Sequence, residues 1–248
     1  MINLVSAWAT DVGLWRNNNE DASLVMPEAG LFAIADGMGG AAAGEVASSY
    51  FVETARTVFG GRSAAAEEDD YGLVQKVFRQ TNERIFEHSA QHPDDEGMGC
   101  TGDLLVFHGD RYVIGHVGDS RVYLLRDGNL KQVTRDHSWV QLQVDQGLLT
   151  PEEARNHPRK NIILCALGTD PSISIDMLEG RGLNRDIFLL CSDGLTDMVE
   201  DAAIRETLVS TGTIQQKVEN LIQAALSAGG RDNTTVILCE VQVNDPAG

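Results

Sequence analysis

A series of short apolar segments, each bounded by turn residues, most constrains the fold that this chain can adopt. Their length, their alternation and their β-branched content predict strands. Tight links such as HGDR at residues 108–111 and the Asp127-Gly128 pair are typical of hairpins, so we expect an antiparallel meander in the middle of the chain. The predicted strands are residues 4–10, 31–35, 103–108, 112–117, 121–126, 130–134, 187–192 and 234–241.

Helical patterns fall between these strands. Residues 44–59 and 71–89 carry apolar side chains at helical spacing, which predicts two helices with one buried face each. Capping-box patterns at Thr213 and Thr150 open two further helices. Helices that flank runs of antiparallel strands indicate an α+β layered domain, with the helices outside and the sheets inside. Residues 135–180 interrupt the strands, and we expect them to form a partly helical insertion that could act as a lid.

Composition narrows the class of protein. A chain of 248 residues with 42% hydrophobic residues is expected to form one globular domain. Its 19 Lys and Arg residues against 37 Asp and Glu residues give a net charge of −18, which argues against nucleic acid and membrane surfaces as partners. The amino terminus does not resemble a signal peptide, and the four cysteines lack Cys-x-x-Cys spacing. We therefore expect core thiols and a cytoplasmic protein.

Aspartates stand at the borders of several predicted strands. In antiparallel sheets the end of one strand lies beside the start of its neighbour, so these acids can share one rim. Carboxylates gathered there would repel one another and raise each other's pKa unless a cation intervened. All the candidate ligands are oxygens, which favours Mg²⁺ or Mn²⁺ over Zn²⁺. The acids are Asp36, Asp119, Asp193 and Asp232, and Gly37 would let its backbone carbonyl approach the ion.

A cationic side chain precedes two further acids near the amino terminus. Arg16 lies shortly before Glu20 and Asp21 in the segment RNNNEDA. Arginine binds phosphate with two parallel hydrogen bonds and keeps its charge at any working pH. An isolated arginine would be an ordinary surface charge. Its spacing to the acids favours a phosphate site instead.

Seven segments in this order resemble the successive motifs of the metal-dependent protein serine/threonine phosphatases, the PPM or type 2C family, in its bacterial form. The segments are RNNNEDA, ADGMGG, GHVGDSRVYLLRDG, DHSWV, NIILCALG, CSDGLTD and GGRDNTTVIL. The resemblance runs from about residue 6 to residue 241. It implies a four-layer αββα sandwich of two central antiparallel sheets flanked by helix pairs. It also implies one phosphatase domain over residues 1–243, with a flap at about 135–180 and a short tail at 244–248.

The resemblance also implies roles for the candidate residues. The activity would be hydrolysis of phosphoserine and phosphothreonine by direct attack of a hydroxide that bridges two Mg²⁺ or Mn²⁺ ions, without a phosphoenzyme. The partners would be phosphorylated proteins and an opposing bacterial serine/threonine kinase, and we expect a monomer. By this resemblance Asp36 bridges both ions, Gly37 contributes its backbone carbonyl, and Asp193 and Asp232 complete one ion's protein ligands. Asp21 and Glu20 help hold the second ion, Asp119 with Asp193 and Asp197 forms a weaker third site, and Arg16 binds the phosphate. The catalytic residues would be Asp36, Asp193 and Arg16.

The chain departs from the family pattern in two places that bear on function. Met38 stands where eukaryotic members have a histidine proposed as general acid, so proton delivery is left to water. Cys165 stands where an arginine usually precedes ALG in the flap.

Two other functions are open to a chain of this kind. A non-catalytic relative could keep the fold as a binding or sensing module, but such a relative would have lost core acids, and none is lost. A nucleotide-binding protein could use the glycines at positions 37, 39 and 40, but they do not fit a phosphate-binding fingerprint.

Overall fold

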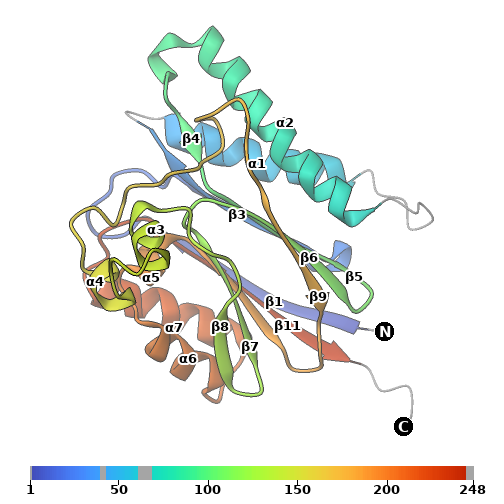
Figure 1. Ribbon diagram of the computed structural model, residues 1–248. Helices are drawn as coiled ribbons and strands as arrows, with labels where there is room; N and C mark the ends of the chain where they lie inside the picture. Colours follow the sequence, from blue (N-terminus) through green and yellow to red (C-terminus); the bar gives the residue numbers. More distant parts are fainter. Residues whose placement is uncertain (1, 40–42, 61–68, 244–248) are drawn as a thin grey trace.

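Two antiparallel sheets form the centre of the protein in a computed structural model, which describes residues 2–39, 43–60 and 69–243 (Figure 1). The tail expected at 244–248 and Gly40 of the glycine cluster lie outside these residues. The first sheet has the order β1 (Ile2–Asp11), β11 (Thr234–Val243), β10 (Ile187–Cys191), β7 (Arg121–Arg126) and β8 (Asn129–Gln132). The second has the order β2 (Asp21–Met26), β3 (Leu31–Met38), β5 (Gly102–His108), β6 (Arg111–Val117) and β9 (Asp176–Arg181), and the short β4 (Gly99–Cys100) pairs with β3.

Helix pairs cover the outer faces of both sheets. In Figure 1 one pair lies over the second sheet and the other pair lies under the first. The pair on the second sheet is α1 (Ala43–Gly60) and α2 (Asp70–Gln91), and the pair on the first sheet is α6 (Asp201–Val209) and α7 (Ile214–Ser227). The predicted αββα sandwich is therefore confirmed.

The alternation of side chains along β3 explains why the chain forms four layers. Successive residues of a strand point to opposite faces. Leu31 and Ala33 pack in the core between the second sheet and its helices. Phe32 and Ile34 pack in the core between the two sheets, where Phe188 of β10 meets them from the first sheet. Because β3 is apolar on both faces, it can lie only in the interior of a layered structure.

The expected meander is wrong in its pairing. β5 and β6 form a hairpin, but the chain then crosses to the other sheet through Gly118, whose φ of +113° suits glycine. β7 accordingly pairs with β8 and β10, and not with β6. The chain-local pattern cannot show this, because β6 and β7 each look like buried strands whichever sheet they join. β2 and β9, which lie at the edges of the second sheet, were not predicted from the sequence pattern.

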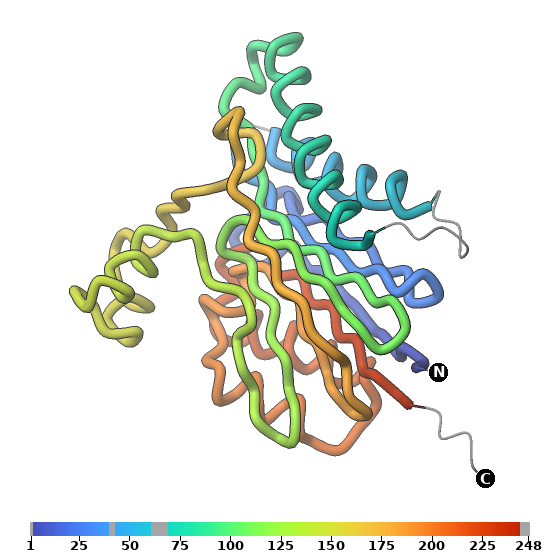
Figure 2. The backbone as a smooth tube through the Cα atoms, turned by 45° about the vertical axis from the view of Figure 1, so that its right-hand side comes forward, coloured from blue at the N-terminus to red at the C-terminus, as the bar shows by residue number. Residues whose placement is uncertain are grey.

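The flap, residues 135–175, leaves the sandwich after β8 and returns as β9. It carries α3 (Trp139–Asp145) and α4 (Pro151–Arg155), and Figure 2 shows it projecting from one end of the sheets. The capping box predicted at Thr150 is present, with its hydroxyl accepting from the backbone N–H of Glu153 at 3.2 Å. Residues 176–180, which we expected in the insertion, belong to β9 and pair with β6. The remaining short helices are Pro27–Ala29, Pro93–Asp95 and α5 (Asp193–Thr196).

Candidate metal and phosphate site

The acids predicted to share a rim meet at one end of the two sheets. Asp21, the first residue of β2, lies opposite Asp36 of β3 in the strand register. Burial raises the pKa of Asp36 well above its usual range, and the charges of Asp21, Asp193, Asp119 and Asp232 raise it further. These five side chains are therefore close enough to repel one another, although they come from both sheets and from distant parts of the chain.

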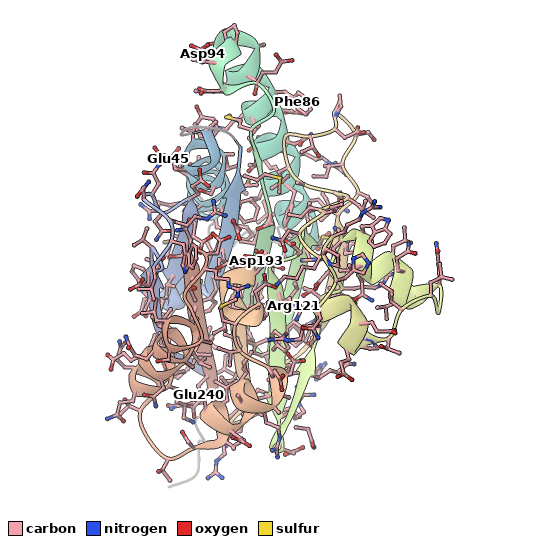
Figure 3. The ribbon with its side chains drawn as sticks, turned by 90° about the vertical axis from the view of Figure 1, so that its left-hand side faces the viewer. Glu45, Phe86, Asp94, Arg121, Asp193 and Glu240 are labelled. Carbon is pink, nitrogen blue, oxygen red and sulfur yellow. The ribbon has the colours of Figure 1, made fainter. Side chains whose placement is uncertain are left out.

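The same repulsion acts on the other members. Burial raises the pKa of Asp193 well above its usual range, with the charges of Asp119 and Asp197 adding to the rise. Burial likewise raises the pKa of Asp119 to about 7 and that of Asp21 to about 6. A divalent cation among these oxygens would offset the repulsion that raises these pKa values. Figure 3 shows Asp193, the first residue of α5, near the middle of the face that it draws.

Asp21 has one oxygen that the protein satisfies and one that it does not. Oδ2 accepts hydrogen bonds from Thr235 Oγ1 at 2.6 Å and from Ser192 Oγ at 2.8 Å. Oδ1 is buried and has no hydrogen-bond partner among the described residues. A buried carboxylate oxygen without a donor is costly in an otherwise closed site. This orphaned oxygen fits a cation or its water.

The donor set fits Mg²⁺ or Mn²⁺ by its chemistry, since every candidate ligand is an oxygen. Within residues 2–39, 43–60 and 69–243, however, no group of three or more His, Cys, Asp and Glu side chains is arranged so that it could hold a metal ion as it stands. The rim therefore brings oxygen donors together, but the described side chains do not form a complete coordination site. The ligand role of each acid stays a prediction.

Gly37 and Glu20 are positioned by backbone packing at the start of α1. The N–H of Gly37 donates to the carbonyl of Glu20 at 3.1 Å, and Ser48 Oγ donates to the same carbonyl at 2.6 Å. A Cβ on residue 37 would lie 2.7 Å from that carbonyl oxygen, so only glycine fits. The close approach of the two backbones thus accounts for Gly37 independently of any role in metal binding. Burial raises the pKa of the Glu20 carboxyl, although Arg16 opposes the rise.

Arg16 reaches the rim through Asp232. Its Nη2 donates to Asp232 Oδ2 at 2.7 Å, and the two side chains are 49% and 34% exposed. The hydrogen bond from this pair raises the pKa of Arg16. A guanidinium has five N–H donors, so one bond to Asp232 leaves others for a phosphoryl group. The predicted phosphate residue and a predicted metal ligand therefore lie in direct contact.

Asn233 is a site residue that the sequence pattern did not predict. Its Nδ2 donates to the carbonyls of Val12 at 2.9 Å and Asn18 at 2.8 Å, while its Oδ1 accepts from the N–H of Glu20 at 2.8 Å. Asn233 is 4% exposed, and it attaches the loop that carries Arg16 to the start of β11. The only sequence signal was its position directly after Asp232.

Thr101 and Ser120 support Asp36 from the neighbouring segments. Thr101 Oγ1 accepts from the Asp36 N–H at 2.8 Å and shares a 2.7 Å hydrogen bond with Ser120 Oγ. Both side chains are buried. The hydroxyl of Thr101 therefore contacts the backbone of a rim residue.

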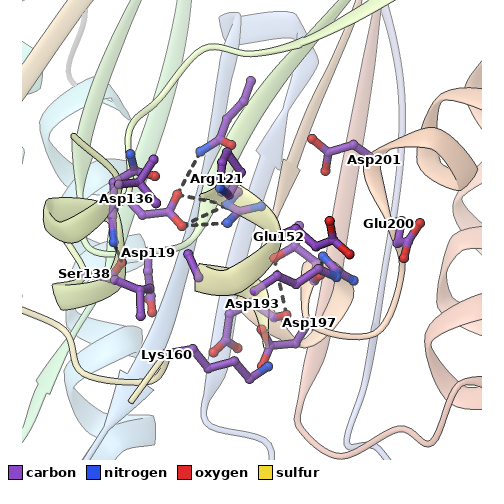
Figure 4. A pocket seen from close by; sticks show the side chains of 18 of the residues that line it. Asp119, Arg121, Asp136, Ser138, Glu152, Lys160, Asp193, Asp197, Glu200 and Asp201 are labelled. Carbon is purple, nitrogen blue, oxygen red and sulfur yellow. Dashed lines mark hydrogen bonds and ion pairs between the residues drawn. The ribbon is translucent and has the colours of Figure 1, made fainter. Parts of the chain in front are cut away.

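A cavity of about 680 Å³ opens between the rim and the flap (Figure 4). Asp119, Asp193 and Asp197 all line it, so the acids expected at a third metal site face the same cavity. Lys160 of the flap forms an ion pair with Asp197. Beside Asp119 in the lining of the cavity, Arg121 donates to both oxygens of Asp136 at distances from 2.7 to 3.1 Å (Figure 4). The flap is thus joined to the rim by charged contacts.

The comparisons with known proteins agree with this geometry. Residues 16–228 match the family model described as Protein phosphatase 2C. The chain belongs to this family.

Named relatives are bacterial. The chain is 43% identical over 238 residues to serine/threonine protein phosphatase PstP of Mycobacterium tuberculosis. The matched region covers 94% of this chain and 44% of PstP. The chain thus spans less than half the length of that relative. It is 40% identical over 236 residues to serine/threonine phosphatase Stp of Listeria monocytogenes, covering 93% of each protein.

Solved structures show the same fold. The crystal structure of the PstP catalytic domain in complex with two manganese ions superimposes with a TM-score of 0.90 at 38% identity, over 98% of this chain and all of that one. The phosphatase Stp1 of Staphylococcus aureus superimposes with a TM-score of 0.90 at 35% identity, over 97% of this chain and 96% of the other.

Among the described residues, no helix combines the length and apolar character needed to cross a membrane.

Proposed function

We propose that this chain is a metal-dependent protein serine/threonine phosphatase that hydrolyses phosphoserine and phosphothreonine. The observation that carries the proposal is the rim where buried, mutually repelling carboxylates lie beside an arginine. Such a rim can bind divalent cations and a phosphate ester next to each other. The names of the relatives, and the two manganese ions bound by PstP, support the same conclusion.

The metal-binding roles follow the predicted residues. Asp36, Asp193 and Asp232 would hold one ion, Asp36 would share the second with Asp21 and Glu20, and Gly37 would contribute its backbone carbonyl. Asp119, Asp193 and Asp197 would hold a weaker third ion beside the flap. Divalent ions at such a site lower the pKa of water and offset the charge of a phosphoryl group.

The chain's own residues bind and orient the substrate. Arg16 would bind phosphoryl oxygens with the donors that Asp232 does not use. Asn233 keeps the Arg16 loop against the rim and so fixes where the guanidinium lies. Met38 carries no ionisable proton, so the departing alkoxide takes its proton from water. The flap lies over the cavity where the rest of a phosphoprotein would pass.

The setting of the activity is also part of the proposal. The substrates would be proteins phosphorylated by a serine/threonine kinase of the same bacterium, in the cytoplasm, and the phosphatase would act as a monomer. The alternative of a non-catalytic sensing module is disfavoured, because every predicted rim acid is present and Arg16 lies among them.

The test is hydrolysis of p-nitrophenyl phosphate and of a phosphothreonine peptide by the purified chain. We expect turnover with Mn²⁺ or Mg²⁺ and none after excess EDTA. Asp193→Asn should lower kcat/KM by about 100-fold or more, since several kcal/mol of charge stabilisation depend on the ions. Asp94→Asn, at an exposed position far from the rim in Figure 3, is the matched control. Undiminished activity in EDTA would overturn the proposal.

A further inference from the structure

Two large apolar side chains stand in solvent next to Arg16. Trp15 is 75% exposed and Leu14 is 68% exposed, and no other large apolar side chain in the described part of the chain is as exposed as either. Single exposed apolar residues are ordinary on protein surfaces. Two adjacent ones, of which one is a tryptophan, are typical of a binding surface.

The loop that carries them is held in place by hydrogen bonds. The N–H of Leu14 donates to the carbonyl of Gly230 at 2.7 Å, and the indole Nε1 of Trp15 donates to the carbonyl of Gly229 at 3.2 Å. Asn233 binds the carbonyl of Val12 from the other side at 2.9 Å. The exposure is therefore imposed by fixed contacts. The polar edge of the indole is satisfied, while most of its apolar surface is left in water.

We propose that Leu14 and Trp15 form an apolar shelf that binds the side chain next to the phosphorylated residue of a protein substrate. The proposal rests on the proposed function, with Arg16 as the phosphate ligand. Trp15 and Arg16 are consecutive, and both side chains contact one loop, the indole at Gly229 and the guanidinium at Asp232. A peptide advances about 3.3–3.6 Å per extended residue. A phosphoryl group at Arg16 therefore brings a flanking residue within reach of the shelf. The shelf selects phosphopeptides with a large apolar residue beside the phosphoserine or phosphothreonine.

A substrate is a better occupant of the shelf than a second copy of the chain. Each copy has a net charge of −18, so two copies repel one another. The shelf is also continuous with the proposed phosphate site through the chain itself. A peptide held at its phosphate loses little further freedom when a neighbouring side chain packs against a rigid tryptophan.

The experiment uses phosphothreonine peptides that are identical except for leucine or glycine on either side of the phosphothreonine. The wild-type chain should favour the leucine peptides in kcat/KM by about tenfold, mainly through KM. Trp15→Ala should bring this ratio close to one, and Trp15→Phe should restore most of it. The ratio is internal to each variant, so a general loss of activity does not affect it. Trp8→Ala is the matched control, because Trp8 is 49% exposed on β1 and should keep the wild-type ratio.

Other outcomes separate the two proposals. If wild-type protein hydrolyses p-nitrophenyl phosphate with Mn²⁺ but does not distinguish the peptides, or if Trp15→Ala keeps the ratio, the shelf is refuted and the phosphatase stands. If nothing is hydrolysed, equilibrium binding of the same peptides still decides, and equal affinities refute the shelf. A wild-type dimer that Trp15→Ala converts to a monomer, measured by analytical ultracentrifugation, would assign the shelf to self-association instead.

Discussion

Replacing Asp119 with asparagine tests whether the rim destabilises the metal-free fold. Asp119 is 8% exposed, and burial raises the pKa of its carboxyl from 3.8 to about 7, with the charge of Asp136 adding to the rise. The ionised form is therefore disfavoured in the folded state. The resulting cost in stability is absent below the unfolded pKa of 3.8, grows as pH rises, and is complete above about pH 7.

The magnitude follows from the change in pKa. A rise from 3.8 to about 7 is worth about 4 kcal/mol, because each pKa unit is worth about 1.36 kcal/mol. The amide removes this charge and keeps an oxygen that can accept from the backbone N–H. We expect metal-free Asp119→Asn to be more stable than wild type by about 4 kcal/mol at pH 8 and by less than about 2 kcal/mol at pH 5. For 248 residues, the difference at pH 8 is a rise in Tm of about 8–16 °C.

The assay is thermal unfolding in EDTA, followed by circular dichroism at pH 5 and pH 8. Asp94→Asn is the control, since it removes the same charge from an exposed residue at the far end of the molecule. Mn²⁺ should stabilise wild type more than Asp119→Asn, because the ion offsets a repulsion that the variant lacks. A gain in Tm that is equal at the two pH values, or absent at both, would refute the reasoning.

Three further predictions concern the site and the base of the flap. Arg16→Ala should raise KM for phosphopeptides by at least about tenfold, and Arg16→Lys should recover only part of this loss, as measured by steady-state kinetics. Met38→His should leave the requirement for Mn²⁺ intact, and turnover by this variant in EDTA would contradict the assignment of the metal. His116 should stay protonated to higher pH than His137 in an NMR titration. Burial lowers the pKa of His116, but the Asp103 carboxylate at 2.8 Å outweighs burial, so the pKa of His116 is raised. Burial and the charge of His116 lower the pKa of His137. The opposite order would show that Asp103 does not keep His116 protonated.

The sequence predicted the elements with strong local signals. Val74 and Phe78 recur at helical spacing, and both are buried in α2. The capping boxes at Thr213 and Thr150 open α7 and α4, because a cap depends on residues only three positions apart. The family motifs predicted the sandwich. β9 escaped prediction because its residues DMLEGR lie at a sheet edge and lack an apolar pattern.

The candidate site was predictable in its composition but not in its contacts. The border positions of Asp36, Asp119, Asp193 and Asp232 suggested a common rim, and the raised pKa values of Asp36, Asp119 and Asp193 agree. No local sequence pattern predicted the hydrogen bond between Arg16 and Asp232, because the two residues are 216 positions apart.

What the sequence determined by itself is therefore whatever a few neighbouring residues encode: the strand and helix periods, the caps, and aspartates placed where strands end. Only the tertiary structure decided that β7 leaves β6 for the other sheet, that Asn233 fastens the Arg16 loop, and that Trp15 stays in water beside the site. These features depend on which distant segments pack together, since the burial and hydrogen bonds that stabilise them exist only once the two sheets have met.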